Sequence, residues 1–509
     1  METTPTPPAP PPFQAIADLM RAHARARPAQ VALRQGDQLL RWAELDAAMD
    51  RVAATLQHEG IAPREAIAIC GHNSLDYAVL FLGALRAGVT VAPLPTGTTV
   101  AQLEGMVADS GARRFFVDAS VPACAPNVPR TRMDDADALR AWLVPPGTKP
   151  ARVKVKPDWA FNIIYSSGTT GTPKGIIQSH GMRWLHVARA DNYGYGPDSV
   201  AMVATSLCSN TTLVCFFPAM AKGGCAVLTE GRFDAAGYLA LAERVRATHA
   251  MLVPVQYQRL MAVPDFDRYD LKSFHMKFCT SAPFAAALKA DVLRRWPGGL
   301  VEYYGMTEGG GTCILEAHLY PDKLHTVGKP AEGHDIRLLD EAGREVPAGE
   351  IGEVVGRSGA MMTAYHNQPA KTREAEWYDE PGNRFIRTGD VGRFDADGFL
   401  TLMDRRKDMI ISGGFNVYPS DLEAVLREHP AVADVAVVGV PSAEWGETPA
   451  AFVVPRAGAP EPEDLRAWAN ERLGKIQRLA AVRYLDELPR SDIGKVLKRE
   501  LRERFAGRG

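Results

Sequence analysis

Two short apolar runs separated by a helical pattern constrain the fold most strongly. Ala66 to Cys70 reads AIAIC and Thr90 to Pro93 reads TVAP, and both runs are typical of buried strands. Asp76 to Ala87, between them, has the length and composition of a helix. Strand, helix and strand in this order predict a βαβ unit, which implies a mostly parallel sheet with helices on its faces.

The length of the chain predicts more than one domain. A chain of 509 residues is too long for one ordinary core. We expect a Pro-rich tail at residues 1–13, a large N-terminal domain at 14–403 and a C-terminal domain at 404–509. From about residue 325, short alternating runs are split by Gly, Pro and Asp, which favours a small antiparallel β subdomain at the end of the large domain. The predicted fold class is therefore α/β with a β subdomain.

The C-terminal segment has its own helix and strand signals. Ser420 is followed three residues later by Glu423, which is the spacing of a capping box and predicts that a helix begins there. Val435 to Val438 predicts a strand, and Ala450 to Val454 is its expected hairpin partner. Asp464 to Leu473 predicts an amphipathic helix. This mixture indicates a compact α+β unit.

Composition narrows the classes of function. Hydrophobic residues make up 46% of the chain and charged residues 23%, which is the balance of a soluble globular protein. The formal net charge of -2 offers no basic surface for a nucleic acid, and the most apolar stretch, Tyr77 to Leu94, is broken by Arg86 and Gly88, so we expect no membrane span. Seven scattered cysteines without a CxxC pair favour a reducing cytoplasm.

The segment Tyr165 to Gly175 carries the strongest chemical signal. It reads YSSGTTGTPKG, with three glycines, five serine or threonine hydroxyls between Ser166 and Thr172, and Lys174. Glycines let backbone N–H groups approach phosphate oxygens, and hydroxyls and a lysine add further donors. Taken alone, the segment also fits a flexible Ser/Thr/Gly surface loop. It is not a Walker A motif, because Pro173 stands before the lysine where that motif has glycine.

The string SSGTTGTPKG resembles the signature loop of the adenylate-forming superfamily. That group contains acyl- and aryl-CoA synthetases, adenylation domains of nonribosomal peptide synthetases and firefly luciferase. The resemblance covers about residues 14–502 and implies a large N-terminal domain of parallel-rich βαβ subdomains that ends in a small β-barrel, followed by a small mobile C-terminal domain. It implies that the ATP phosphates are bound by Ser166, Ser167, Gly168, Thr169, Thr170, Gly171 and Lys174.

A second motif follows in the order that the superfamily has. Val301 to Glu308 reads VEYYGMTE, an apolar run that leads into aromatic, hydroxyl and carboxylate side chains. An aromatic ring can stack on adenine, a hydroxyl can bond a phosphate, and a carboxylate can hold Mg²⁺. A strand end with a core tyrosine is the alternative for the segment alone. The resemblance implies Tyr304 near adenine, Thr307 on phosphate and Glu308 on magnesium, with Ser281, Ala282 and Pro283 along the adenine edge.

Residues from about 387 onward match the ribose and hinge motifs. Asp390 falls in an RTGD string, and a carboxylate accepts two hydroxyl hydrogens well. The resemblance implies that Asp390 and Arg405 bind the ribose, that Lys407 is the hinge, and that Gly413 and Gly414 line a pantetheine tunnel for coenzyme A. A simple turn and a solvated charged linker are the alternatives for these segments alone.

The string LPRSDIGK near the C-terminus resembles the segment that carries the superfamily's catalytic lysine. The resemblance implies that Lys495 stabilises the negative charge that builds up when the substrate carboxylate attacks the α-phosphorus. A lysine near a C-terminus is otherwise an ordinary surface residue. The expected catalytic residues are therefore Lys495, Thr307 and Glu308, and the expected cofactors are ATP, Mg²⁺ and coenzyme A.

The acyl pocket departs from the usual pattern. Many CoA ligases have a His or aromatic gate where this chain has TSLCSNTTLVC, and Ser209 or Asn210 falls near that gate. A neutral Asn210 argues mildly against an α-amino acid as substrate. Gly309 and Gly310 either leave room for a ring or chain, or simply form a tight turn. The motifs do not name the acid; an aryl or medium-chain acid is our expectation.

Three functions are compatible with these motifs. The first is an ATP-dependent carboxylic acid–CoA ligase. The second is an adenylation enzyme that loads a separate carrier protein. The third is a luciferase-like oxygenase or a catalytically inactive nucleotide-binding relative. Only the inactive relative is disfavoured by the intact site residues, which are Lys174, Glu308, Asp390, Arg405 and Lys495. A homodimer is compatible with the sequence.

Overall fold

A computed structural model describes residues 11–166, 174–405, 408–412, 415–442, 445–474, 477–491 and 494–506. Contacts divide the chain into two compact units. The first unit comprises residues 1–325, 330–335 and 356–386, and the second comprises residues 326–329, 336–355 and 387–509. The domain boundary expected at residue 404 stays a prediction, since these units follow contacts and not motifs.

The N-terminal βαβ prediction is confirmed in the first unit. A six-stranded sheet has the order β6-β5-β3-β4-β7-β8, and β3, β4, β5 and β6 run parallel. Helix α3 connects β3 to β4, and its inner face is buried against the sheet. The strands are β3 (Ala66–Cys70), β4 (Thr90–Leu94), β5 (Ala112–Val117), β6 (Arg130–Arg132), β7 (Ala160–Ser166) and β8 (Lys174–Ser179). The helices are α2 (Trp42–His58), α3 (Leu75–Arg86), α4 (Val100–Ser110) and α5 (Ala136–Trp142).

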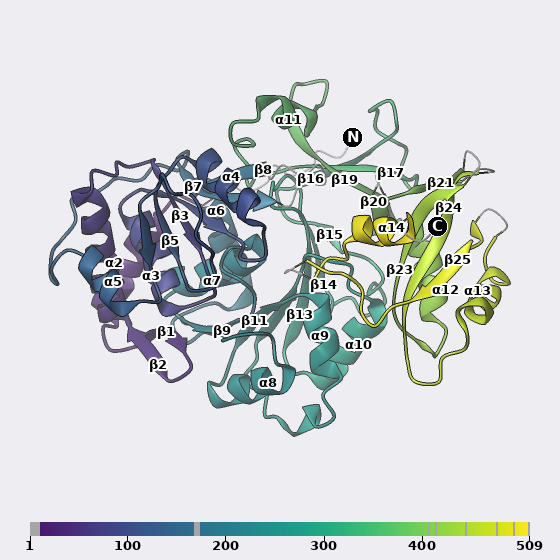
Figure 1. The fold of residues 1–509 in the computed structure, drawn as a ribbon, viewed down its shortest axis with the longest axis horizontal. Coiled ribbons are helices and arrows are strands. Elements are labelled where there is room, and N and C mark those ends of the chain that lie inside the picture. The colour runs from purple at the N-terminus through teal and green to yellow at the C-terminus, as the bar shows by residue number, and fades with distance from the viewer. Residues whose placement is uncertain are drawn as a thin grey trace. The chain divides into compact units, whose positions relative to one another are not determined.

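A nine-stranded sheet forms the rest of the first unit's framework. Its order is β15-β14-β13-β12-β11-β9-β10-β1-β2, and the strands from β13 to β1 in this order run parallel. Helix α10 packs against β13, and α9 packs against α10 (Figure 1). The strands are β1 (Val31–Gln35), β2 (Gln38–Arg41), β9 (Val200–Val203), β10 (Cys225–Leu228), β11 (His249–Leu252), β12 (Met276–Cys279), β13 (Gly299–Tyr304), β14 (Cys313–Glu316) and β15 (Lys329–Pro330). The helices are α1 (Ile16–Ala26), α6 (His180–Ala188), η1 (Arg189–Tyr193), α7 (Asn210–Ala221), α8 (Ala235–Arg244), α9 (Pro254–Met261), η2 (Phe266–Arg268) and α10 (Ala286–Arg295).

The region predicted to be a small β-barrel is a five-stranded sheet. Its order is β16-β17-β19-β18, with β20 also paired to β19, and β19 runs antiparallel to both β18 and β20. The elements are β16 (Asp335–Leu339), β17 (Gly352–Arg357), α11 (Pro369–Glu374), β18 (Glu376–Tyr378), β19 (Arg384–Phe394) and β20 (Leu400–Arg405). The predicted antiparallel arrangement is thus confirmed for these pairs.

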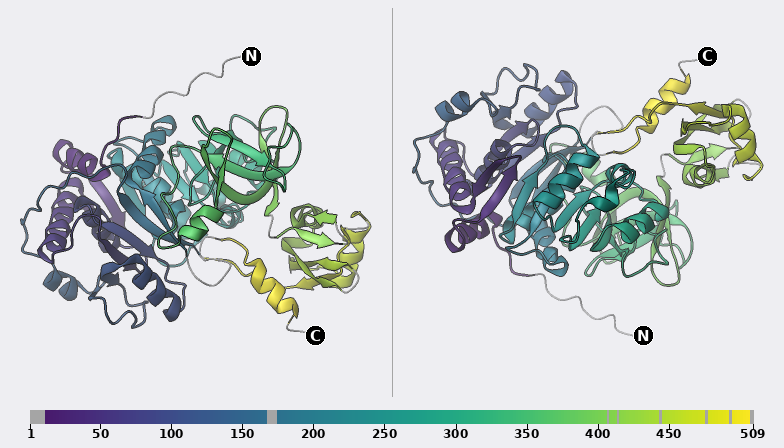
Figure 2. Two further views of the ribbon diagram at one scale, coloured as in Figure 1. Left: turned by 90° about the horizontal axis from the view of Figure 1, so that it is seen from above. Right: turned by 90° about the horizontal axis from the view of Figure 1, so that it is seen from below.

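A second five-stranded sheet forms the C-terminal part of the second unit, and Figure 2 shows it from two further sides. The predicted hairpin is confirmed, because β23 and β24 are antiparallel neighbours along most of their length. The strands are β21 (Ile410–Ser412), β22 (Phe415–Val417), β23 (Val432–Ser442), β24 (Gly446–Pro455) and β25 (Ala481–Tyr484). The helices are α12 (Pro419–Arg427), α13 (Pro462–Asn470) and α14 (Lys498–Ala506).

The predicted capping box at Ser420 is wrong. Helix α12 begins one residue earlier, at Pro419, and its N-cap is Tyr418, which makes no side-chain cap bond. Proline suits the first helical position, since its missing N–H would have no partner there. Glu423 does not turn back to the cap; its Oε1 accepts the N–H of Val437 in β23 at 3.0 Å, which ties the helix to the sheet.

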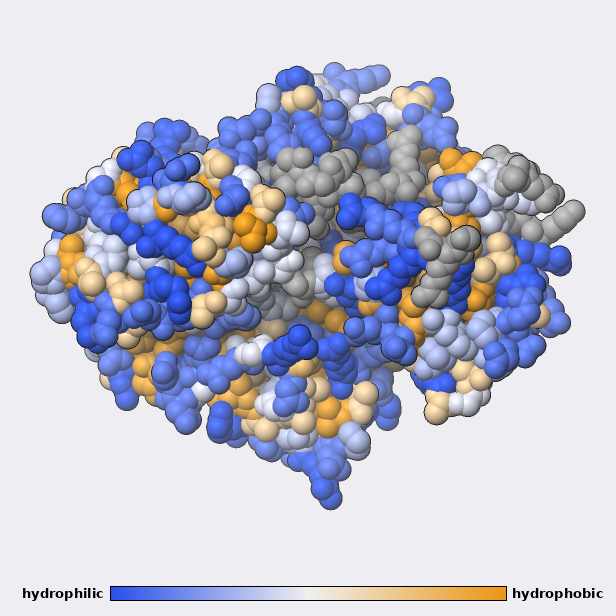
Figure 3. Space-filling view, viewed as in Figure 1, coloured by the Kyte–Doolittle hydropathy of each residue, from blue (hydrophilic) through white to orange (hydrophobic). Residues whose placement is uncertain are grey.

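The surface agrees with the composition. On the face drawn in Figure 3, hydrophilic residues cover most of the surface and hydrophobic residues occur in small groups. Within the described ranges, no helix has the length and apolar character that crossing a membrane requires.

Candidate active site

The two strands that flank the predicted phosphate loop are paired in the first unit. β7 and β8 are antiparallel, and Ser166 stands directly opposite Lys174. Gly175 follows with no space for a side chain, because a Cβ there would lie 2.8 Å from Ile163 Cγ2. The predicted phosphate ligands Ser167, Gly168, Thr169, Thr170 and Gly171, and the side chain of Ser166, lie outside the described residues.

Lys174 and Glu308 meet at one tyrosine, Tyr365. The Lys174 ammonium lies 5.0 Å from the centre of the Tyr365 ring, and the Tyr365 hydroxyl donates to Glu308 Oε1 at 2.8 Å. The Glu308 carbonyl accepts the N–H of Met362 at 2.7 Å, so both its backbone and its side chain are fixed. Burial and the Glu308 charge raise the pKa of Tyr365, which keeps the hydroxyl protonated as a donor. The structure therefore brings two predicted site residues together.

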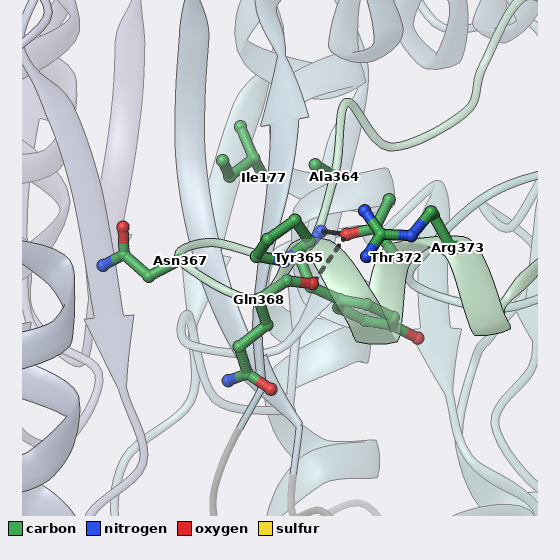
Figure 4. A pocket seen from close by; sticks show the side chains of 8 residues that line it. Ile177, Ala364, Tyr365, Asn367, Gln368, Thr372 and Arg373 are labelled. Carbon is green, nitrogen blue, oxygen red and sulfur yellow. Dashed lines mark hydrogen bonds between the residues drawn. The ribbon is translucent and has the colours of Figure 1, made fainter.

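Tyr365 also borders a hollow of about 410 Å³ next to this group. Figure 4 shows the Thr372 hydroxyl between the backbone N–H of Tyr365 and the carbonyl of Gln368, at 3.0 and 3.1 Å. These bonds fix the turn that leads into α11 and with it the Tyr365 backbone. The hollow is lined by Ile177, Ala364, Tyr365, Asn367, Gln368, Pro369, Thr372 and Arg373.

A buried polar network fixes the backbone of Thr307. The Gln178 side chain donates to the Thr307 carbonyl at 2.8 Å and to Asn210 Oδ1 at 3.2 Å. The buried guanidinium of Arg183 also donates to Asn210 Oδ1, at 3.1 Å, and to Gln178 Oε1. Asn210, predicted near the acyl gate, thus lies within one hydrogen-bonded group with the backbone of Thr307. Ser209 is the N-cap of α7, and its side chain accepts the N–H of Thr211.

The loop predicted along the adenine edge has a strained backbone. Ser281 has φ of 84°, a left-handed conformation that is uncommon for a residue with a side chain. Its hydroxyl is hydrogen-bonded to the Thr211 hydroxyl, and the neighbouring Thr280 donates to the Tyr303 carbonyl at 2.8 Å. Ala282 and Pro283 follow Ser281 after β12. The next strand, β13, ends at the buried Tyr304, so the loop and this predicted adenine contact lie at the ends of adjacent parallel strands.

Close backbone packing explains the glycines after Glu308. Gly309 has φ of 75°, and a Cβ there would lie 2.0 Å from the Ala360 carbonyl oxygen. Gly310 has φ of 83°, and a Cβ there would lie 2.9 Å from the Gly356 carbonyl oxygen. Any side chain would therefore push the motif loop away from these segments. The role of Gly309 and Gly310 in an acyl pocket stays a prediction.

In the second unit, the two predicted ribose residues are cross-strand partners. Asp390 in β19 stands opposite Arg405 in β20, in antiparallel register. The turn before Asp390 is held by Thr388, whose hydroxyl donates to the Val354 carbonyl at 2.8 Å and accepts the Asp390 N–H at 3.0 Å. The backbones of the two residues are thus paired, while the side chain of Arg405 lies outside the described residues. The predicted hinge Lys407, and Gly413 and Gly414, lie outside the described residues.

Lys495 is exposed on a short turn of the second unit. The Ser491 N–H donates to the Lys495 carbonyl at 2.8 Å, and the Lys495 N–H donates to Ser491 Oγ at 3.2 Å. Arg490 anchors this turn, since it donates to the Gly494 carbonyl at 2.7 Å and pairs with Asp434 of β23 at 2.5 Å. The backbone position of Lys495 is thus well defined, although its side chain extends to the surface.

The donor set is compatible with Mg²⁺ held together with a nucleotide. In the described residues, no group of three or more His, Cys, Asp or Glu side chains is placed to hold a metal ion. Glu308 offers a partly exposed carboxylate that Tyr365 fixes through one oxygen. Mg²⁺ is commonly bound through one or two carboxylates plus substrate phosphates, and not by an all-protein cage.

Comparison with known proteins assigns the family. The model of the AMP-binding enzyme family matches residues 20–366, and that of the AMP-binding enzyme C-terminal domain matches residues 421–495. A feruloyl-CoA synthase of Amycolatopsis sp is 34% identical over 497 residues, with 95% of this chain and 97% of that protein covered. A fatty acid–[acyl-carrier-protein] ligase, ScoC of Streptomyces coeruleorubidus, is 29% identical, with 98% of each covered. The chain therefore belongs to the AMP-binding enzyme family.

The fold agrees with this assignment. The structure of o-succinylbenzoate CoA synthetase (MenE) of Bacillus subtilis, in complex with its acyl-adenylate intermediate, matches with a TM-score of 0.84 at 26% identity. The match covers 96% of this chain and 98% of that one. The predicted α/β fold class, with a large N-terminal and a small C-terminal part, is confirmed.

Proposed function

We propose that this chain joins a carboxylic acid to coenzyme A in two half-reactions, with the residues named below in defined roles. The family and the named relatives make it an ATP-dependent, AMP-forming acid–CoA ligase. In the first half-reaction the acid and ATP give acyl-AMP and pyrophosphate. In the second, the CoA thiol displaces AMP and forms the thioester.

The convergence of Lys174, Tyr365 and Glu308 is the observation that carries this proposal. A lysine at the end of a glycine-rich loop and a carboxylate fixed by a tyrosine hydroxyl form the two halves of a phosphate–magnesium site. Residue 365 is 57 positions away from Glu308 in the sequence, so this arrangement exists only in the folded chain.

In adenylation, the protein mainly positions reactants and neutralises charge. The substrate carboxylate attacks the α-phosphorus in line, its oxygen forms the new P–O bond, and the bond to pyrophosphate breaks. We assign phosphate binding to Lys174, Thr307 and the loop that begins at Ser166, and ribose binding to Asp390 and Arg405. When bound, Mg²⁺ neutralises phosphate charge, and Glu308 is the residue that would hold it. Lys495 stabilises the charge that develops during attack.

For thioester formation, we propose that Gly413 and Gly414 let the pantetheine chain pass close to the backbone. Lys407 is the proposed hinge about which the C-terminal part turns between the two half-reactions. The CoA thiolate then attacks the acyl carbon, and AMP leaves with the electrons of the broken C–O bond. We also propose that the enzyme works in the cytoplasm; a homodimer stays a prediction.

Loading of a carrier protein is the second candidate function. The similarity to ScoC, over nearly the whole of both chains, favours it as an alternative for the second half-reaction. The first half-reaction is the same in both cases. The two functions therefore differ only in the thiol that accepts the acyl group.

Pyrophosphate release with Mg-ATP, measured across a panel of carboxylic acids with and without CoA, tests the proposal. Identification of the products by mass separates the outcomes. We expect acyl-CoA for one class of acid. Acyl-AMP without a thioester would move the assignment to carrier-protein loading, and the absence of pyrophosphate with every acid would contradict adenylation itself.

A further inference from the structure

Four side chains that can carry positive charge gather beside the motif loop of the first unit. Arg183 and His186 belong to α6, Arg189 begins η1, and His334 follows β15; we call this group the cation cluster. Arg183 Nη1 lies 3.4 Å from His186 Nδ1, and Arg189 Nη2 lies 3.1 Å from His334 Nε2. Burial, then the charges of Arg183 and Arg189, lower the pKa of His186. The positive charges are thus close enough to affect one another.

Arg183 is a fully buried charge without an acidic partner in the described part of the chain. Its guanidinium donates to amide oxygens of Gln178, Asn162 and Asn210, and its Nε has no acceptor. Burial lowers its pKa to about 9. The undescribed loop 167–173 contains no Asp or Glu either. Buried arginines ordinarily have a carboxylate, because an uncompensated charge is costly away from water.

Arg86, elsewhere in the same unit, is a buried arginine that is paired with carboxylates. It is also buried, but it pairs with Asp50 at 2.9 Å and with Asp46 at 2.6 Å. Both arginines therefore face a desolvation cost, and of the two Arg86 alone meets it with carboxylates of the protein. An anion supplied from outside would complete the cation cluster in the way that two aspartates complete the surroundings of Arg86.

The contact between Arg189 and His334 points to where such an anion would bind. His334 Nδ1 accepts the backbone N–H of Thr312 at 2.9 Å, so in a neutral ring the proton is on Nε2. Burial and the charge of Arg189 lower the pKa of His334 to about 3, which keeps the ring neutral. Nε2–H and the Arg189 Nη2–H are then two donors facing each other, and a carboxylate oxygen could accept from both.

The position of the cluster connects it to the acid substrate. Asn210 Oδ1 accepts from both Arg183 and Gln178, and Gln178 holds the carbonyl of Thr307, a proposed phosphate ligand. Thr312, which donates to His334, directly follows the glycines after Glu308. The cluster is therefore hydrogen-bonded to both ends of the loop at which the reacting carboxylate would be placed.

We infer that the cation cluster binds a second carboxylate of the substrate, so that the enzyme activates one end of a dicarboxylic acid. This inference rests on the proposed adenylation function, whose acid it specifies. The charge of Glu316 reaches Tyr193 together with that of Arg189, so Glu316 is an acidic residue near this region. It forms no ion pair with Arg183 or Arg189 within the described ranges, so it does not occupy the position of the second carboxylate.

Matched pairs of acids test the inference. Glutarate, adipate and terephthalate are each compared with their monomethyl esters, which keep the size and remove one charge. We expect kcat/KM for pyrophosphate release to be at least about tenfold higher for one diacid than for its ester, because hydrogen bonds between charged groups are the strong ones. Arg189→Gln should bring that ratio to within about twofold, and Arg189→Lys should keep part of it.

Controls separate this role from a structural one. Arg244→Gln, which removes an exposed arginine from α8, should leave the ratio unchanged. If R189Q does not fold, as judged by its melting temperature, His334→Gln is expected to lower the same ratio. Equal use of diacid and ester by the unaltered enzyme would overturn the inference, as would an R189Q effect confined to the KM for CoA. Pyrophosphate release with monoacids alone would overturn the inference of a second carboxylate but leave adenylation intact. No release with any acid would overturn both this inference and the proposed adenylation.

Discussion

Glu308 and Lys495 are held in opposite ways. Glu308, in the first unit, is fixed through its carbonyl by Met362 and through its carboxylate by Tyr365, and it is partly buried. Lys495, in the second unit, is exposed, and the bonds found around it fix the backbone of its turn. A fixed position suits the metal-binding role proposed for Glu308, whereas Lys495, proposed to act in only one of two half-reactions, must be able to leave the site. This contrast predicts which substitutions affect chemistry and which affect structure.

Lys495→Gln should have the largest effect. Removal of one group that stabilises the charge of a transition state costs about 10²- to 10³-fold in rate. We expect this loss in pyrophosphate release, with an unchanged melting temperature because the side chain is exposed. Thioester formation from supplied acyl-AMP and CoA should be retained. Lys272→Gln, the same charge change at another exposed lysine, is the control; an equal loss in both half-reactions would contradict the assigned role.

Glu308→Gln should cost about a hundredfold in adenylation, since a neutral amide is a poor ligand for Mg²⁺. In contrast to the lysine variant, part of this loss should be recovered at high Mg²⁺, because weaker binding is compensated by concentration. The measurement is the rate of pyrophosphate release as a function of Mg²⁺. A loss that does not change with Mg²⁺ would show that Glu308 acts in another way.

Arg490→Gln tests whether the role of Lys495 in adenylation depends on the turn that Arg490 anchors. The variant loses the ion pair with Asp434 and the bond to the Gly494 carbonyl, so the position of Lys495 becomes less defined. Because small displacements of catalytic groups are costly, we expect about a thirtyfold loss in kcat for adenylation with little change in KM. Arg499→Gln removes an exposed arginine that pairs within α14 and should change neither value. Full activity of R490Q would show that Arg490 does not position Lys495 for adenylation.

Local sequence patterns predict some parts of the site and fold but miss those that depend on distant contacts. Lys495 and Glu308 can both be proposed as site residues from the sequence alone, because each belongs to a local string of characteristic residues. Tyr365 was not, because its partner is 57 residues away and a tyrosine in a turn carries no local signal of that bond. The βαβ elements follow from apolar periodicity, which depends on near neighbours alone. The capping box failed at Ser420 because Glu423 bonds to β23, a tertiary contact that spacing does not reveal.

Tyr365→Phe measures how much the fixed geometry of Glu308 contributes. The variant keeps the ring beside Lys174 and removes only the hydroxyl that donates to Glu308. Loss of such an orienting bond to a metal-binding carboxylate costs about tenfold. We expect that reduction in the apparent affinity for Mg²⁺ during pyrophosphate release, and a small change in kcat. An effect as large as that of Glu308→Gln would instead assign a direct role in chemistry to Tyr365.

The dense packing that fixes the first unit also makes it sensitive to acid. His249 is fully buried; its Nε2 is hydrogen-bonded to the Tyr193 carbonyl at 2.9 Å, and its ring stacks on Tyr195. Burial lowers its pKa to about 4, below the value of about 6.5 for an unfolded chain. The unfolded state therefore binds more protons between these values, so stability is complete above about pH 6.5 and falls as the pH is lowered toward 4.

Because His249 is buried in its neutral form, we expect the free energy of unfolding to fall by about 2 kcal/mol between pH 6.5 and pH 5 from this one group. His249→Gln cannot take up the proton, and its amide can still donate to the Tyr193 carbonyl. The variant should be less stable at pH 7 because the stacking on Tyr195 is lost, yet its free energy of unfolding should change less with pH. Denaturant unfolding at pH 7, 6 and 5 measures both effects. Parallel pH profiles would mean that His249 already accepts a proton in the folded state, and that acid sensitivity arises elsewhere in the unit.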